Sequence, residues 1–211
     1  MAAGDDDATG WFEPLYAAAE AGEAVVPWHS GGPTPLLVEW TSVRAIEGWG
    51  RRAVVVGCGL GDDAEHVASL GFETIAFDIA PTAIRGARRR FPESAVEYVV
   101  ADLFDMPSAW LSAFDLVVEV ITVQALPDPP RAAAIAAVSS LVAAGGTLVV
   151  ISGAREAGDA ADGPPWPLTR AEVEAFANGR GRSGPHRGPS RAAGAVVPAL
   201  ARGVPPLTRV G

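Results

Sequence analysis

The sequence contains no lysine, and all 16 of its basic residues are arginine. This absence excludes enzymes that form a Schiff base through a lysine, as well as nucleotide-binding proteins that need a P-loop lysine. The single cysteine, Cys58, excludes an internal disulfide framework and any zinc site built from several cysteines. No apolar run approaches the roughly 20 residues of a membrane-spanning helix, so a globular protein without membrane contact is expected.

Charge is distributed unevenly along the chain. Residues 1–177 contain ten arginines and all 25 acidic residues, a net charge of −15, whereas the six remaining arginines follow them. Residues 1–177 are so acidic that they would repel phosphate backbones. Nucleic acid is therefore not an expected partner. The first ten residues, MAAGDDDATG, lack the basic and apolar regions of a signal peptide, which predicts a cytoplasmic location. The sequence carries no signal for an oligomeric state.

From Arg52 onward, short apolar runs alternate with helical segments. Strands are expected at 53–57, 73–78, 96–101, 114–121 and 147–153, and helices at about 62–70, 81–90 and 130–143. The strand runs are apolar throughout, as is typical of strands buried on both faces of a parallel sheet. The pattern predicts an α/β fold with a Rossmann-like, doubly wound and mostly parallel sheet, and the turn after 53–57 would lie at its switch point if that strand is central.

Further helices are expected on either side of this pattern. Residues 11–22 and 34–48 predict a helical cap that precedes the first strand. Thr169 followed by Glu172 forms a capping box, which predicts the start of one more helix. The loop at 154–168 is long enough to cover a ligand site, with Trp166 as a wall.

A glycine-rich turn, VVVGCGLGDD at 54–63, follows the expected central strand. A dinucleotide-binding fingerprint would place its third glycine at the position of Asp62. Asp62 and Asp63 instead put two carboxylates at the start of the next helix, where a pyrophosphate would otherwise bind. We therefore expect a ligand that approaches the backbone closely and carries no phosphate there, which disfavours an NAD-dependent oxidoreductase.

Acidic residues end the second and third expected strands. Asp78 follows Gly61 by 17 residues, near the offset at which an acid binds ribose hydroxyls; a helix N-cap is the alternative. Asp102 lies at the same edge of the sheet, where a carboxylate can accept from an adenine amino group. Asp105 is the rival for that role, and an ordinary turn aspartate is the other possibility. Together the turn and the two acids predict an adenosine joined to something other than phosphate.

Successive segments resemble the motifs of class I S-adenosylmethionine-dependent methyltransferases: VVVGCGLGDD, FDIAPTAI, ADLFD, FDLVVEV and LVAAGGTLVVIS. PWHSGGPTPLLVEW and GPPWPLTRAEVEAF resemble the thiopurine S-methyltransferase-like branch, which includes halide and thiol methyltransferases. The resemblance covers about residues 25–177. It implies S-adenosyl-L-methionine as cofactor and a small-molecule methyl acceptor, with a thiol or other soft nucleophile favoured over oxygen. The alternative is a non-catalytic S-adenosylmethionine-binding protein with an incomplete acceptor side.

The resemblance also implies cofactor-binding residues. Gly57, Gly59 and Gly61 would line the methionine and ribose parts of the cofactor. Asp78 would bind the ribose hydroxyls, and Ile79 would pack against adenine.

Four more residues complete this set. Asp102 and the backbone of Leu103 would contact the adenine edge. Trp28 would close over the cofactor, unless it is an ordinary core aromatic. Glu119 would meet the positive centre or the amino group of the cofactor, unless it faces water at the end of its strand.

Neither a catalytic residue nor a metal ligand is assigned. A soft thiol acceptor needs little help from a base, whereas a phenol or amine would need one, for which His29, Glu119 and Asp128 are the candidates. Cys58 is not expected to act as a nucleophile, because nothing near it in the motif suggests a base.

Two regions are expected. Residues 1–177 would form the methyltransferase domain with its N-terminal helical cap. Residues 178–211 are basic and rich in glycine and proline, which predicts a disordered tail or the product of a frame-shift. The family completes its sheet with antiparallel sixth and seventh strands. Since no convincing pair follows Ala177, the last one or two strands are expected to be missing or altered.

Overall fold

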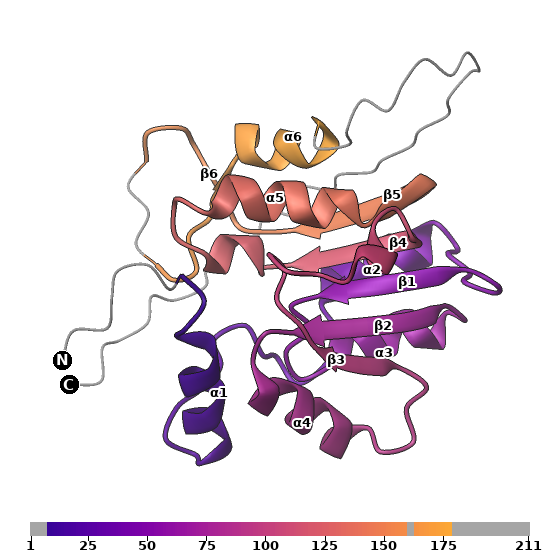
Figure 1. Ribbon diagram of the computed structural model, residues 1–211, viewed down its shortest axis with the longest axis horizontal. Coiled ribbons are helices and arrows are strands. Elements are labelled where there is room, and N and C mark those ends of the chain that lie inside the picture. Colours follow the sequence, from indigo (N-terminus) through magenta and orange to yellow (C-terminus); the bar gives the residue numbers. More distant parts are fainter. Residues whose placement is uncertain (1–7, 160–162, 179–211) are drawn as a thin grey trace.

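A five-stranded parallel sheet forms the centre of the protein in a computed structural model that describes residues 8–159 and 163–178 (Figure 1). The strands are β1 (Arg52–Val56), β2 (Glu73–Asp78), β3 (Glu97–Val100), β4 (Phe114–Val120) and β5 (Val142–Ile151). Their order is β3-β2-β1-β4-β5, and each neighbouring pair is parallel. The predicted Rossmann-like fold is thereby confirmed, and β1 is its central strand.

The strand order changes direction at β1. Val56, the last residue of β1, is in register with Phe77 of β2 on one side and with Glu119 of β4 on the other. The chain thus winds outward in both directions from β1, and the carboxyl ends of β1 and β4 flank the switch point. Ligands of open α/β sheets bind beyond this edge.

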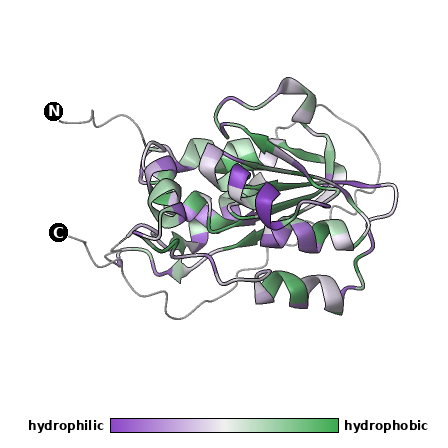
Figure 2. Ribbon diagram, turned by 90° about the horizontal axis from the view of Figure 1, so that it is seen from below, coloured by the Kyte–Doolittle hydropathy of each residue, from purple (hydrophilic) through white to green (hydrophobic). Residues whose placement is uncertain are grey.

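Helices pack on both faces of the sheet. They are α1 (Phe12–Glu20), α2 (Pro35–Val43), α3 (Asp62–Ser69), α4 (Pro81–Arg90), α5 (Arg131–Ser140) and α6 (Arg170–Asn178), with short 3-10 helices η1 (Ser108–Trp110) and η2 (Val123–Ala125). One hydrophobic core joins the sheet to α5 and α6, and the other joins it to α2 and α3. Figure 1 shows α1 at the arrowhead ends of the strands. In Figure 2 the strands are mainly hydrophobic, and hydrophilic residues gather on helices and loops.

Most element boundaries match the prediction, but α2 ends five residues earlier than expected. Ala45 has a φ of 46°, in the left-handed region, and the N–H of Ile46 donates to the carbonyl of Thr41 over 3.0 Å. This is the bond of a Schellman-type helix end. The capping box is confirmed, because the Thr169 N–H donates to Glu172 Oε2 at 2.7 Å and the Glu172 N–H donates to Thr169 Oγ1 at 3.3 Å.

β5 begins at Val142, whereas the sequence predicted that helix would continue to 143 and strand would start at 147. Val142 already pairs with Phe114, and a register shift separates this pair from the next. A side chain at Gly146 would lie 2.7 Å from the carbonyl oxygen of Phe114, so a glycine is needed for the two strands to pass this closely. Two short parallel strands, β6 (Ala154–Arg155) and β7 (Leu168–Thr169), were not predicted.

The structure leaves part of the predicted organisation untested. Apart from the backbone of Asn178 in α6, the tail at 178–211 lies outside the described residues. Across 8–159 and 163–178, no strand pairs with β5 on the side away from β4. No helix in the same described segments is long and apolar enough to cross a membrane.

Candidate cofactor-binding site

A cleft opens at the carboxyl ends of the parallel strands, where α1 and the loop before α2 close over the sheet. It consists of two adjoining cavities of about 600 and 560 Å³, including space open to solvent. Both cavities are lined by Tyr16, Trp28, Val56, Gly57, Val120 and Ile121. Because these residues line both cavities, the two spaces adjoin and form one continuous site.

The glycine turn forms the floor between the two cavities. Gly57 lines both of them, and Gly59 lines the second. Their φ angles are +58° and +53°, a conformation that favours glycine, and a side chain on Gly59 would lie 2.7 Å from the Tyr16 hydroxyl. Gly61 is not among the lining residues of either cavity; it precedes α3 and packs against Tyr98.

Asp78 ends β2 and lines the first cavity, although its side chain is only 6% exposed. Its Oδ2 accepts a hydrogen bond from the Gly59 N–H and its Oδ1 accepts one from the Ala80 N–H, both at 2.9 Å. Burial raises the pKa of Asp78 to about 6, and these two hydrogen bonds act in the opposite direction. The Ile79 N–H also bonds the carboxylate, and the lone pairs that remain are available to a ligand hydroxyl.

The far end of the first cavity contains the residues predicted to contact adenine. Ile79, Asp102 and Leu103 all line it, with Phe104 beside them. Oδ1 of Asp102 accepts the N–H of Phe104 at 2.8 Å, so part of the carboxylate shapes the loop after β3. Asp105, the rival in the sequence, is exposed and does not line the cavity.

Trp28 lies at the junction of the cavities and belongs to an aromatic group from the N-terminal cap. Its Nε1–H donates to the hydroxyl of Tyr16 at 3.1 Å, and its ring meets Trp11 and Phe12 edge-on. Tyr16 and Phe12 also line the first cavity, and the sequence analysis missed both. Phe12 and Tyr16 are four residues apart, which indicates that they lie on the same face of a helix. The spacing does not indicate that this face covers a ligand site.

Glu119 does not reach either cavity. It is 0% exposed, its Oε1 accepts the N–H of Val123 at 2.9 Å, and its Oε2 has no hydrogen-bond partner. Burial raises the pKa of Glu119 to about 7. The alternative of a strand-end acid facing water is therefore wrong, and direct contact with a cofactor in the cleft would require a rearrangement of η2.

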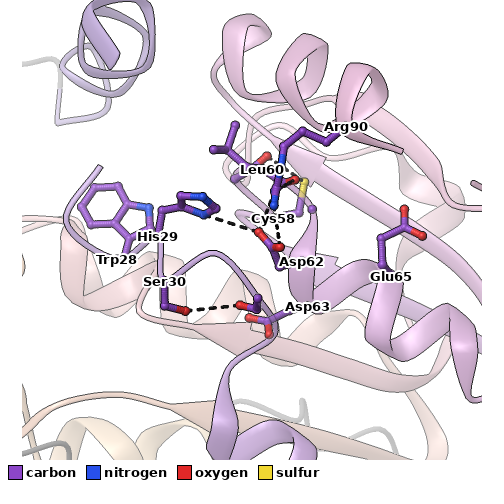
Figure 3. Close-up of polar contacts among 12 residues, drawn as sticks. Trp28, His29, Ser30, Cys58, Leu60, Asp62, Asp63, Glu65 and Arg90 are labelled. Atoms are coloured by element: carbon purple, nitrogen blue, oxygen red, sulfur yellow. Dashed lines mark hydrogen bonds and ion pairs between the residues drawn. The ribbon is translucent and has the colours of Figure 1, made fainter. Parts of the chain in front are cut away.

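Asp62 and Asp63 have structural partners, which weakens the charge argument made from the sequence. Both carboxylate oxygens of Asp62 accept from the guanidinium of Arg90 at 2.7 Å (Figure 3). Asp63 accepts from the N–H and the hydroxyl of Thr34, at 2.6 and 2.9 Å. Arg90 offsets the charge of Asp62, so the repulsion of phosphate at this helix start is smaller than the bare sequence indicates.

Of the three candidate bases, only His29 lines the cleft. It faces the second cavity, whereas Asp128 lies in a separate groove between α5 and α6. Cys58 also lines the second cavity, and burial raises the pKa of its thiol well above the ordinary value, which keeps it un-ionised. Trp166 lines neither cavity; its N–H donates to the carbonyl of Gln124 at 2.7 Å. The described residues include no cluster that could hold a metal ion.

Known proteins share this architecture. Residues 53–146 match the family described as "Methyltransferase domain". A ubiquinone biosynthesis O-methyltransferase from Xanthomonas axonopodis pv. citri is 35% identical over 130 residues, which are 57% of this chain and 53% of that protein. The chain thus spans about half the length of the curated relatives that it matches.

Solved structures agree on the fold. Magnesium protoporphyrin IX methyltransferase from Synechocystis PCC 6803 with bound S-adenosylmethionine has a TM-score of 0.61 at 15% identity, covering 85% of this chain and 88% of that one. A structure titled "Conversion of a Disulfide Bond into a Thioacetal Group during Echinomycin Biosynthesis" has a TM-score of 0.63 at 23% identity, covering 78% and 76%.

The parallel sheet, the glycine turn at its switch point and the acid that ends β2 define a Rossmann-like cofactor-binding fold. Residues 53–146 match the methyltransferase-domain family, and the fold is the one that binds S-adenosylmethionine in the Synechocystis enzyme. The residues present suit that cofactor, because the acid beside the glycine turn faces an elongated cleft that continues past it in both directions. These matches do not extend to the thiopurine S-methyltransferase-like branch.

Proposed function

We propose that the protein transfers a methyl group from S-adenosylmethionine to a small-molecule acceptor. One observation carries this proposal: Asp78 is bonded to the glycine turn and also faces the cleft, where a ribose can meet its carboxylate. Residues up to 177 would form the methyltransferase domain. When bound, the cofactor supplies a methyl group on a sulfonium, which an acceptor nucleophile displaces in line.

The residues of the cleft would position the cofactor. Gly57 and Gly59 allow close approach of its ribose and methionine parts, and Asp78 binds the ribose hydroxyls. The adenine ring packs between Ile79 and Leu103, with Asp102 accepting from its amino group. Trp28 covers the junction. Gly61 packs against Tyr98 and Glu119 accepts a hydrogen bond from η2, and neither would contact the cofactor.

The protein would accelerate the reaction mainly through placement. Holding the nucleophile, methyl group and sulfur in line is worth roughly 7–11 kcal/mol of the barrier. The apolar lining of the first cavity, which includes Phe12, Leu126 and Ala125, would exclude water around the transferring group.

The acceptor atom is sulfur or oxygen in this proposal, supported by different observations. The likeness of PWHSGGPTPLLVEW to thiol methyltransferases favours sulfur. The relatives named ubiquinone biosynthesis O-methyltransferase favour oxygen. A thiol acceptor fits a cleft with His29 as its single base candidate, because a thiol ionises readily without help.

Formation of S-adenosylhomocysteine from S-adenosylmethionine tests the proposal, with a thiophenol and a catechol as acceptors. We expect turnover with at least one of them, and its loss in Asp78→Ala but not in Asp105→Ala, which alters an exposed acid near the same edge. Calorimetry should find binding of S-adenosylhomocysteine and none of NAD. Binding without turnover on any acceptor would favour the non-catalytic alternative, and binding of NAD alone would refute the proposal.

A further inference from the structure

A third cavity lies between α1 and α4, next to the cofactor-binding cleft. Its volume is about 610 Å³, including space open to solvent. Figure 1 shows the two helices side by side, and their residues are in contact. Tyr16, Val26 and Leu60 line both this cavity and the second cavity of the cleft, so these side chains separate the two spaces. The proposed function makes no use of the third cavity.

Polar contacts join α1 and α4 at both ends of the third cavity. Glu13, in the first turn of α1, accepts the N–H of Thr82 in the first turn of α4 at 2.9 Å. At the last turns, Nη2 of Arg89 lies 2.5 Å from Oε1 of Glu20. Gly86 lines the cavity between these contacts and has no side chain to fill it. The gap between the helices is therefore fixed by the fold.

The rim of the cavity at the last turns carries an excess of positive charge. The guanidinium groups of Arg85 and Arg89 lie 3.5 and 2.5 Å from the single carboxylate of Glu20. In the part of the chain that the structure describes, no other partner is found for the Arg89 guanidinium, which has five N–H donors. Its side chain is 59% exposed, so an anion from solvent can reach it. Arg90 also lines the cavity, but its guanidinium is bound to both oxygens of Asp62.

The interior of the third cavity is apolar. Ala19, Val26 and Leu60 line it. The hydroxyl of Tyr16 is engaged on the side of the cleft, where it accepts the Nε1–H of Trp28 at 3.1 Å. An apolar interior with one surplus cation at its rim suits a molecule that has an apolar body and a single negative charge. A carboxylate fits best, since its two oxygens match the planar N–H fork of a guanidinium.

We propose that the cavity between α1 and α4 is a second ligand site, which takes a small apolar carboxylate whose charged group is bound by Arg89. The apolar body would pack against Ala19, Val26 and Leu60, where its removal from water supplies most of the affinity. The inference concerns a site apart from the cofactor-binding cleft, and it does not depend on methyl transfer.

Two probes of similar shape test the proposal: 4-phenylbutyrate, which carries the charge, and 4-phenylbutanamide, which does not. Calorimetry on the full chain should find binding of both, with about a three- to fivefold preference for the carboxylate, because exposed charge pairs are weak. Arg89→Gln should remove that preference and keep the binding of the amide. Arg170→Gln, which removes a 92% exposed cation on α6, should behave like the wild type.

Filling the cavity provides an independent test. Ala19→Leu should weaken the binding of both probes by about tenfold, because the added carbons take the place of the apolar body. The matched control is Ala17→Leu, which alters an exposed position of the same helix and should bind both probes like the wild type. If Ala19→Leu does not fold, Arg89→Gln still decides the outcome, because its side chain is mostly exposed.

Saturating S-adenosylhomocysteine distinguishes the third cavity from the cleft, and both probes should still bind in its presence. The proposal would be overturned if S-adenosylhomocysteine displaced the probes, or if neither probe bound the wild type. Equal affinity of the wild type for the two probes, or unchanged affinity in Ala19→Leu, would also overturn it. Failure of S-adenosylhomocysteine to bind would instead refute the cofactor assignment, and the two variants would still show whether Arg89 and Ala19 contact the probes.

Discussion

The backbone N–H of Gly59 donates a hydrogen bond to Oδ2 of Asp78 over 2.9 Å, although 19 residues separate them. This bond joins the turn after β1 to the end of β2. The turn that admits a ligand and the acid that would bind it are thus held together. Because Asp78 is almost fully buried, its ionisation is coupled to this geometry and to any ligand in the cleft.

Binding of 5′-methylthioadenosine should strengthen as pH rises through about 6. The pKa of Asp78 is raised to about 6, so the carboxyl is largely protonated at pH 5 and ionised at pH 7.5. If only the ionised form accepts both ribose hydroxyls, affinity should rise about tenfold over this interval. 5′-Methylthioadenosine has no amino-acid end, so its binding depends on the adenosine part of the cleft. Calorimetry at both pH values measures the effect. Asp78→Asn should bind weakly at both, and Asp105→Asn should behave like the wild type.

Glu119→Gln should remove a pH dependence of stability. The pKa of Glu119 is raised to about 7 by burial, so the folded protein holds this proton more tightly than the unfolded chain. The wild type therefore loses stability as pH rises between about 4.5 and 7, by roughly 2 to 3 kcal/mol from this group. Urea unfolding of both proteins at pH 5 and pH 8 checks this. A difference between the two proteins that stays constant with pH would contradict it.

Gly59→Ala should disrupt both stability and cofactor binding. A methyl group there would lie 2.7 Å from the Tyr16 hydroxyl, in addition to the strain of a φ of +53°. Gly145→Ala is the matched control, because Gly145 has a φ of +79° and nothing within 4 Å of its added carbon. The control should lose about 1 kcal/mol of unfolding free energy. Gly59→Ala should lose more and bind S-adenosylhomocysteine weakly; equal losses in both variants would count against the contact with Tyr16.

Arg131→Ala should destabilise the packing of α6 on α5. Arg131 is 4% exposed, pairs with Glu172 at 2.9 Å and donates to the carbonyl of Leu126 at 2.8 Å. Glu172 is 24% exposed, so the loss of Arg131 should cost about 1.5 to 3 kcal/mol, the range for hydrogen bonds to charged groups. Arg170→Ala, which removes a 92% exposed cation paired with Glu174, should leave stability nearly unchanged, because solvent screens this pair. Denaturant unfolding compares the two, and similar values would show that burial of Arg131 does not matter.

Local patterns in the sequence were sufficient to predict the sheet. Continuous apolar runs and the helices between them specify β1 to β4 to within about two residues, because burial on both faces requires uninterrupted apolar side chains. β5 was predicted less well, because Val142 pairs with Phe114 through a register shift that no local pattern records. The end of α2 depends on the left-handed backbone conformation of Ala45. An alanine gives no sequence signal for that conformation.

The sequence by itself determined the turn and the acids at the strand ends, and from them the proposed cofactor class, because these follow from residue type and spacing along consecutive elements. Only the tertiary structure decided which side chains reach the cleft. Glu119 proved to be buried beneath η2, and Asp62 proved to be neutralised by Arg90, which is 28 residues away. Tyr16 and His29 entered the site from the N-terminal cap. Such contacts join residues far apart in the chain, so they depend on packing rather than on local pattern.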